Sequence, residues 1–480
     1  MMRILPDFRP ARQHPAFRRL LVGGLLSTLG SAMTSFAVVL QIWDLSKSSL
    51  AVGLLGLTFV PVLIVGLLGG SIADVVDRRK LALATSAGLM AVSAAFAVQA
   101  YAEFGQLWLL YTLAMVQAVL QATGAPARGT FVARLVPANQ LTAAIALNTL
   151  TGRITMLFGP ALAGVIAGVW GLRTCYAIDA VSFVAALYAI ARLPAMRPPR
   201  PEASGAPGSG PGESGAAGSR PGESGAAGSR PAKSGVAGRS VVRRGGMRPS
   251  LRATAEGLRF IRHRPVLVAA FLTDLNAMLL GLPVALFPAL NAAHFGGSPQ
   301  TLGLLNAAPG VGGLLAAAMS GPAGRVSRQG RGMLAGTMIW GLAIACFGLT
   351  RSLPLALALL ALAGAADTLT VVFRGSMVQT VTSDEFRGRV SSVEYIIGTG
   401  GGPLGNVESG VVASLTTPTI SAVIGGLGCF VVAALIGFAF PVFTRYRAPS
   451  PDAARWPFPP GESVSAGDAP GDAGSAQANT

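Results

Sequence analysis

The sequence predicts an all-helical protein that crosses the membrane twelve times, in two sets of six helices. Hydrophobic residues make up 51% of the 480 residues and charged residues only 12%, whereas soluble globular domains are about one quarter charged. Apolar runs recur along the chain, and each is long enough for the roughly twenty residues that cross a bilayer as a helix. The alternating segments of about ten residues that would predict a β-barrel are not found.

The apolar runs place the predicted spans. The first set is expected at 18–42, 49–73, 80–101, 106–127, 141–168 and 173–193. The second set is expected at 266–291, 300–322, 332–350, 353–373, 390–416 and 419–443. The seventh span should be the least regular, because Pro283 and Pro288 each lack the amide hydrogen that a helix needs. The run that begins near Leu20 is too long for a signal-peptide core and should remain as the first span.

The arginines and lysines lie in alternate loops and set the expected orientation. One side carries the bases of the N-terminus and of residues 78–80, 128–134, 325–331, 387–389 and 445–455. The opposite loops hold only Lys47, Arg173 and Arg351. Because loops rich in Lys and Arg stay in the cytoplasm, we expect a multi-pass protein of the inner or plasma membrane with both termini inside. The net charge of +17 does not indicate nucleic acid, since no basic patch is interleaved with aromatic residues.

The segment between the two sets of spans has a different composition. The decapeptide Pro211–Arg220 recurs unchanged at Pro221–Arg230. Chains this rich in Pro, Gly and Ser do not bury enough apolar surface to fold. We therefore expect a basic cytoplasmic N-terminus at 1–17, six-helix halves at 18–193 and 265–443, a largely disordered cytoplasmic linker at 194–264 and a disordered tail at 444–480. Replication slippage is the favoured explanation of the repeat, and a binding module is the alternative.

The two halves resemble each other at corresponding positions. The matching pairs are Gly70–Arg78 with Ser320–Arg328, Arg128–Val132 with Arg374–Val378, and Gly159-Pro160 with Gly402-Pro403. Their offsets of 250, 246 and 243 are nearly constant. Such matches indicate an internal duplication, which is how many transporters are built.

These features resemble the major facilitator superfamily. Its signature in the turn between spans two and three is Gly-x-x-x-Asp-Arg-x-Gly-Arg-Arg/Lys, and the turn here supplies Gly70, Asp74, Arg78 and Arg79. Val75 and Asp77 depart from that pattern. The branch that contains the enterobactin exporter and drug efflux proteins is similar in further stretches: Ala125–Arg128, Ala146–Asn148, Phe158–Gly164, Leu282–Pro288 and Phe386–Ser391. The resemblance implies two pseudo-symmetric six-helix bundles of the major facilitator fold and a secondary active transporter.

The resemblance also implies a gating role for the turn. Asp74 would pair with bases across the domain interface in the outward-open state, and an ion pair at a half-wet interface contributes about 1–3 kcal/mol. The second-half turn has Gly324 and Ser327 where the first has Asp74 and Asp77, so only the first turn can form an acid-dependent latch. For Arg79 and Lys80 a plain topology signal is the alternative. The gating candidates are Gly70, Asp74, Asp77, Arg78, Arg79, Arg128, Gly159 and Pro160.

Gly159 and Pro160 belong to a shortened antiporter motif. Residues 159–164 read Gly-Pro-Ala-Leu-Ala-Gly, one residue short of the Gly-Pro-x-x-Gly-Gly core. Proline kinks the helix and the small neighbours permit close packing. Packing without any directional meaning is the alternative.

Charged residues inside predicted spans are expensive and are therefore functional candidates. The candidates for proton coupling or substrate contact are Arg153, Asp274, Asp367, Arg374, Glu394 and Glu408; Asp179 lies near the outer end of the sixth span. A carboxylate that takes up a proton as its cavity changes solvation would couple transport to the proton gradient, in the order of preference Asp274, Asp367, Glu408, Glu394. Asp367 and Arg374 are seven residues apart, hence on one helix face, too distant for contact but able to share a cavity. Arg153 is expected to be a partner or an anionic-substrate contact. For each residue the alternative is an interhelical pair or a snorkelling side chain.

No cluster of catalytic or metal-ligating residues and no phosphate-binding loop is found, so we expect neither an enzyme nor an ATP-driven pump, and no cofactor. Cys175, Cys346 and Cys429 have no metal-site or disulfide spacing. The expected function is proton-coupled export of a small amphipathic organic compound, such as a drug, siderophore or secreted metabolite, by a monomer. An importer or uniporter of a small solute is one alternative, and a non-transporting membrane sensor or scaffold is another.

Overall fold

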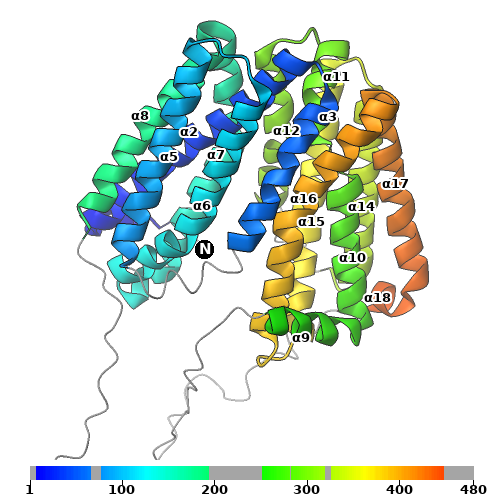
Figure 1. Cartoon of the computed structure of the whole chain (residues 1–480). Helices are drawn as coiled ribbons and strands as arrows, with labels where there is room; N and C mark the ends of the chain where they lie inside the picture. The colour runs from blue at the N-terminus through cyan, green and yellow to red at the C-terminus, as the bar shows by residue number, and fades with distance from the viewer. Residues whose placement is uncertain (1–6, 66–76, 194–250, 282, 319–325, 448–480) are drawn as a thin grey trace, which may run out of the picture.

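A computed structural model of the protein describes residues 7–65, 77–193, 251–281, 283–318 and 326–447. These residues form helices joined by short turns, and they contain no β-strand (Figure 1). Gly70 and Asp74, two of the predicted gating residues, lie outside the described residues, as do the decapeptide repeat and the tail from Ala448.

The first set of long helices is α2 (Pro15–Ser46), α5 (Arg78–Tyr101), α6 (Leu107–Leu135), α7 (Leu141–Trp170) and α8 (Leu172–Ala191). Between α2 and α5, α3 (Ser49–Leu54) continues through the 3-10 turn η1 (Leu55–Thr58) into helical residues 59–65. Short elements are α1 (Arg9–Gln13) and η2 (Ala138–Gln140).

The second set is α10 (Pro265–Leu280), α12 (Pro299–Ala318), α14 (Gln329–Leu349), α15 (Leu353–Val381), α16 (Arg387–Leu415) and α17 (Pro418–Ala439). The predicted seventh span is broken, as its prolines led us to expect, into α10, η3 (Val284–Leu286) and α11 (Phe287–His294). The chain also forms α9 (Leu251–Arg262) before this set and α18 (Pro441–Arg445) after it.

Ten of the described helices are long and apolar enough to cross a membrane. The predicted second span appears as the shorter apolar helix Ser49–Val65, and the predicted eleventh is α16, whose 29 residues include Arg387, Arg389, Glu394 and Glu408. The all-α polytopic fold is confirmed, and the described helices are consistent with twelve spans.

Local sequence explains where several helices begin. Proline occupies a first-turn position in α2, α10, α15 and α17, where its missing amide hydrogen is not needed. Asp77 caps α5, because its Oδ1 accepts hydrogen bonds from the backbone of Arg79 at 2.8 Å and Lys80 at 3.4 Å. Thr417 caps α17 in the same way by accepting from the Ile420 amide.

The two sets of helices meet at one end of the molecule and diverge toward the other (Figure 1). We call the end where they meet the α11 end and the opposite end, where α9 lies, the α9 end. Close contacts join α7 to α12, where a Cβ on Gly164 would lie 2.9 Å from the Cα of Gly303. They also join α3 to α16, where a Cβ on Gly53 would lie 2.4 Å from the Asn406 carbonyl oxygen. Glycine at these positions allows the backbones to approach each other.

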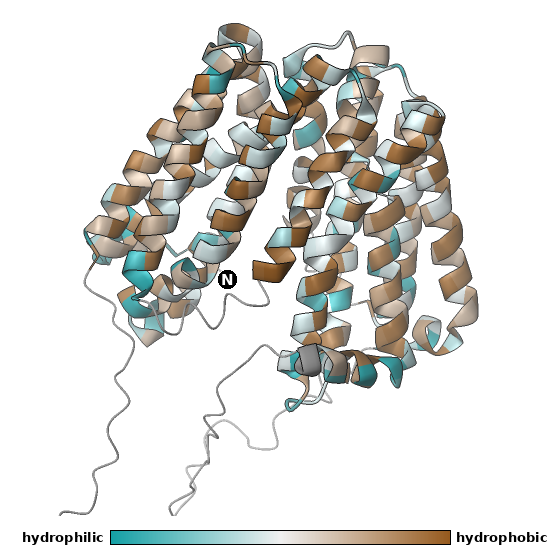
Figure 2. Cartoon of the chain, viewed as in Figure 1, coloured by the Kyte–Doolittle hydropathy of each residue, from teal (hydrophilic) through white to brown (hydrophobic). Residues whose placement is uncertain are grey.

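Helix α9 was not predicted, because its residues fall in the segment assigned to the linker. It runs across the base of α10 and α16 rather than along them, and it is one of the most hydrophilic helices (Figure 2). The Phe260 ring stacks on Phe386 with centroids 4.5 Å apart, and Glu256 Oε2 lies 3.2 Å from Arg389 Nε. Gly257 fits against the Arg389 backbone, which a Cβ would approach within 2.4 Å. These contacts fasten α9 to the start of α16.

Candidate functional site

Two cavities lie along the divide between the helix sets. The second-half cavity has a volume of about 410 Å³ and is lined mainly by α10, α12, α14 and α15, with contributions from α7 and α16. Its charged lining residues are Arg153, Asp274 and Asp367. Apolar side chains such as Phe287 and Trp340 make up much of the remaining wall. A cavity of this size with a few polar groups on an apolar wall is typical of a small-molecule site.

A buried ion network adjoins this cavity. Arg374 of α15 binds the Asp274 carboxylate of α10 through Nη1, and its Nη2 lies 3.6 Å from Glu394 Oε1 of α16. Arg374 is 8% exposed and Asp274 only 4%. Because removing one partner of a buried pair leaves an uncompensated charge, the Asp274–Arg374 pair holds α10 against α15, and Glu394 adds α16 to the arrangement. Three of the sequence-predicted candidates are therefore brought together.

The other candidates are placed differently. Asp367 lines the second-half cavity and Arg153 reaches it from α7, so that their charges interact across the divide. Arg374 is not among the lining residues, so it does not share the cavity wall with Asp367 in this structure. Glu408 is half-buried on α16, and neither a hydrogen bond nor an ion pair joins it to another described residue.

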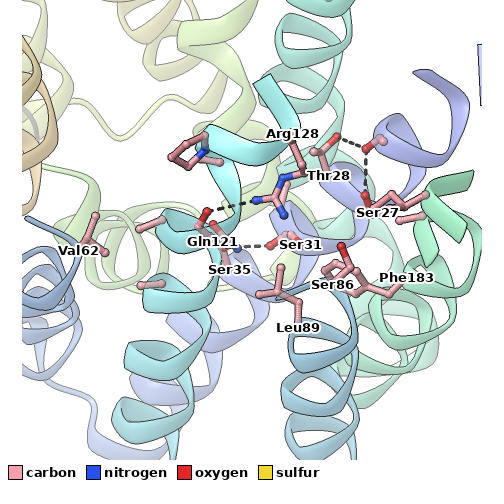
Figure 3. Close-up of a pocket in the computed structure, with 18 of the residues that line it drawn as sticks. Ser27, Thr28, Ser31, Ser35, Val62, Ser86, Leu89, Gln121, Arg128 and Phe183 are labelled. Atoms are coloured by element: carbon pink, nitrogen blue, oxygen red, sulfur yellow. Dashed lines mark hydrogen bonds between the residues drawn. The ribbon is translucent and has the colours of Figure 1, made fainter. Parts of the chain in front are cut away.

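The first-half cavity is the larger one, at about 880 Å³ (Figure 3). It is lined by the α9-end parts of α2, α5, α6 and α8, by Val62 and Val65 of the helical residues 59–65, and by Tyr395 and Thr399 of α16. Hydroxyl and amide side chains recur along it: Ser27, Thr28, Ser31, Ser35, Ser86 and Gln121. Arg128 is the one charged residue among its described lining residues. The sequence had assigned Arg128 to gating and had not indicated these hydroxyl groups.

A polar junction also joins three helices inside the first half. The Asp179 carboxylate of α8 is fully buried. It accepts hydrogen bonds from Thr34 at 2.7 Å, from Ser93 at 2.6 Å and from Ser31 at 3.4 Å. Gly30 leaves the necessary room, since a Cβ there would lie 2.6 Å from Asp179 Oδ1. These partners were missed because isolated serines and threonines in an apolar run carry no pairing signal.

The second half has a related junction without an acid. Cys429 lies 250 residues after Asp179, the same offset that relates the two charged turns. The Asn276 side chain donates to the Cys429 carbonyl oxygen at 2.9 Å, and the Cys429 thiol lies 3.9 Å from the Thr337 carbonyl oxygen. The duplicated positions therefore join the corresponding helices with different chemistry.

We expect Asp179→Leu to lower the apparent melting temperature of the purified protein by several degrees, because the buried hydroxyls of Thr34 and Ser93 lose their acceptor at about 1–3 kcal/mol for each unsatisfied group. Asp179→Asn keeps one acceptor oxygen and should have a smaller effect. The control is Asp44→Asn, which removes an exposed ion pair with Lys47 at 2.9 Å and should have little effect. Scanning fluorimetry measures all three. Equal melting temperatures for Asp179→Leu and the control would contradict a stabilising junction.

The gating candidates that the structure describes have identifiable local contacts. Asp77 caps α5, and Arg78 is the first residue of that helix. Arg79 Nη2 donates to the Ala191 carbonyl oxygen at the end of α8. On α7, Gly159 packs against Ala32, whose Cβ would lie 2.5 Å from a Cβ at that glycine. The Pro160 carbonyl oxygen lies against Gly303 of α12, 2.7 Å from the position of a Cβ there. The shortened antiporter motif thus lies where the halves meet.

Within the described part of the chain, no group of three or more His, Cys, Asp or Glu side chains is arranged to hold a metal ion. The chemistry that the two cavities offer is that of binding and charge compensation. The second-half cavity combines two carboxylates with one arginine, Arg153, and the first-half cavity combines hydroxyls with Arg128.

Comparison with known proteins agrees with this architecture. Enterobactin exporters EntS from Citrobacter koseri and Shigella flexneri are 26% and 25% identical to the chain over 442 and 441 residues, which cover 92% of it and 95% of each exporter. The structure is similar to that of a bacterial homologue of the human lysosomal transporter Spinster in an inward-facing, unoccupied conformation, with a TM-score of 0.64, 14% identity and coverage of 91% and 97%. It is also similar to a bacterial homologue of the iron transporter ferroportin in an inward-facing state, with a TM-score of 0.61, 16% identity and coverage of 90% and 99%.

The model of the transmembrane secretion effector family matches residues 6–204 and 241–466, which include both helix sets. The protein is therefore a multi-pass membrane transporter, and the chain belongs to the transmembrane secretion effector family of the major facilitator superfamily.

Proposed function

We propose that this transporter exports a small amphipathic organic compound from the cytoplasm in exchange for protons. The observation that carries the proposal is the pair of carboxylates Asp274 and Asp367 on the wall of the second-half cavity, with Asp274 bound to Arg374 and Glu394 at 3.6 Å from that arginine. A carboxylate whose arginine partner can be released when the helices move is able to exchange a proton as its surroundings change. Export as the direction is supported by the similarity to proteins named enterobactin exporters.

Alternating access is the proposed mechanism. The halves touch at the α11 end through α7 with α12 and through α3 with α16, and they diverge at the α9 end (Figure 1). Rocking of the two halves about the cavities would separate the contacts at the α11 end and close the α9 end. The positive-inside rule supports a cytoplasmic α9 end, because Arg78, Arg79 and Arg331 lie there. The proposed latch at Asp74, outside the described residues, would act at this same end.

The test uses inside-out membrane vesicles that contain the full-length chain. With an acidic lumen, the vesicles should accumulate labelled enterobactin, which serves as the probe because of the similarity to its exporters. Nigericin, which dissipates the pH gradient, should remove the accumulation. Equal accumulation with and without the gradient would reject proton exchange. Movement only down the gradient of the probe would favour a uniporter, and an absence of any movement with a panel of siderophores and drugs would favour a sensor or scaffold.

A further inference from the structure

We propose that the first-half cavity binds the anionic group of an organic cargo through Arg128. The inference rests on the proposed transport of an amphipathic compound and specifies its chemical class. The cargo would carry a carboxylate or a comparable anionic group on an apolar body with hydroxyl or amide hydrogens. This site is separate from the carboxylate-rich second-half cavity.

The first argument concerns charge. Arg128 is the one charged side chain among the described lining residues of the cavity. Helices α5, α6 and α7 contain no Asp or Glu, and the one acid of α2, Asp44, pairs with Lys47 at the α11 end. Asp179 of α8 is already bound by hydroxyl groups. No carboxylate among the described residues therefore compensates Arg128.

The duplicated half makes this difference plain. Arg374 lies 246 residues after Arg128, on the corresponding helix α15, and it is paired with Asp274 and Glu394. These acids belong to α10 and α16, whose first-half counterparts are α2 and α7. The arginine at this duplicated position is thus neutralised in the second half, as Arg374. In the first half, as Arg128, it has no carboxylate partner among the described residues. An anion supplied by the cargo would complete the charge balance.

The second argument concerns position. The Arg128 Nη2 donates to the Gln121 carbonyl oxygen at 3.1 Å. A Cβ on Gly124 would lie 2.6 Å from Arg128 Nη1 and 2.6 Å from Thr85 Oγ1, so this glycine leaves the room that the guanidinium occupies. Figure 3 shows the guanidinium beside Gln121, in the cavity that the hydroxyl groups of α2 also line. Because these contacts hold the Arg128 guanidinium in place, less conformational entropy is lost when it binds an anion.

The third argument concerns the surrounding hydroxyls. Ser27 and Thr28 donate to the Gly24 carbonyl oxygen at 3.1 and 2.9 Å, and Ser35 donates to the Ser31 carbonyl oxygen at 2.9 Å. Because their hydrogens are used by the helix, the oxygens of Ser27 and Ser35 remain as acceptors, whereas the oxygen of Thr28 also lies 3.0 Å from the Thr155 hydroxyl. They suit a ligand with hydroxyl or amide hydrogens. The volume of about 880 Å³ lies within the range of sites for drug-sized molecules.

The experiment compares two probes of nearly equal shape, 3-hydroxy-2-naphthoate and its uncharged amide, 3-hydroxy-2-naphthamide. Binding to the full-length protein in neutral-lipid nanodiscs is measured by equilibrium dialysis, with empty nanodiscs as the blank. We expect the anion to bind at least about tenfold more tightly than the amide, because a charge-assisted pair with arginine is stronger than a neutral hydrogen bond. Arg128→Gln should remove this preference by weakening the binding of the anion and not that of the amide. Arg128→Lys should retain part of the preference.

Two further variants separate the site from general effects. Arg134→Gln changes an exposed arginine of the same helix and should leave both affinities unchanged. Gly124→Ala should weaken the binding of the anion, because the added methyl group displaces the Arg128 guanidinium. Equal affinity for the two probes in the unaltered protein, or an unchanged preference in a monodisperse Arg128→Gln variant, would overturn the proposal.

Binding is measured without any pH gradient, so its outcome is distinct from that of the export test. An intact anion preference with no gradient-driven export would reject the proposed function and keep the site. Gradient-driven export with no anion preference would reject the site and keep the function.

Discussion

Asp274→Asn is expected to abolish accumulation driven by a pH gradient, lowering its initial rate by about 100-fold or more. The Asp274 carboxylate is 4% exposed and binds Arg374, whose remaining partner Glu394 lies at 3.6 Å. Loss of one charge from a buried pair costs about 3–5 kcal/mol, and each 1.4 kcal/mol corresponds to about a factor of ten. The asparagine also cannot take up or release a proton. Initial rates in inside-out vesicles measure the effect.

The second variant of this series is a double variant that carries both Asp274→Asn and Arg374→Gln. The single variant leaves Arg374 without its carboxylate and should lower the amount of folded protein. The double variant removes both charges, so it should restore that amount while gradient-driven transport stays absent. Asp367→Asn, at the cavity wall, should also reduce the response to the gradient. The control is Asp384→Asn, which removes an exposed pair with Arg387 and should transport normally. Transport that responds fully to the gradient in both Asp274→Asn and Asp367→Asn would rule out these carboxylates as proton carriers.

Gly164→Val is expected to separate the halves at the α11 end. A Cβ at this position would lie 2.6 Å from the Pro299 carbonyl oxygen and 2.9 Å from Gly303 Cα, so α7 and α12 can no longer approach so closely. Overpacking of this kind costs about 1–3 kcal/mol. Because only the conformer with these helices in contact bears that cost, the ratio of conformers should shift by about five- to 150-fold toward the one in which they are apart.

The shift is measured between spin labels at Arg173 and Arg351, two exposed residues at the α11 end on opposite halves, after replacement of the three native cysteines. The distance between the two labels, measured by double electron–electron resonance, should lengthen in Gly164→Val. The matched control is Gly152→Val on the same helix, where a Cβ meets no atom within 4 Å. Identical distance distributions in the two variants would show that the glycine contact does not set the conformer.

The membrane helices were predictable because each is a long run of apolar residues that can be recognised in the sequence alone. Even α16, the most polar of the predicted spans, was recognised because its charges are separated by apolar and glycine-rich stretches. Helix α9 was not, because its twelve residues directly follow the segment rich in Pro, Gly and Ser and were assigned with it to the linker. Its residues have a strongly amphipathic helical pattern, but the contacts that fasten it to α16 are visible only in the folded chain.

The same distinction holds for the site. Asp274, Arg374 and Glu394 each stood out as a charge within an apolar run, but the contact between the first two joins residues 100 positions apart and needs the folded chain. Asp179 was noticed and left without partners, since Thr34 and Ser93 are ordinary residues of their helices. Arg128 was assigned to gating by its motif, and only the cavity around it indicates binding. The roles expected for Gly70 and Asp74 stay predictions.

The attachment of α9 has a consequence for how this gene can vary. Glu256 and Phe260 hold the chain against Arg389 and Phe386 before the second half begins, so the register of α10 is set downstream of the repeated decapeptide. Copies of PGESGAAGSR can then be gained or lost without displacing the membrane helices. Length polymorphism among strains should therefore concentrate upstream of Leu251 and spare the residues of α9.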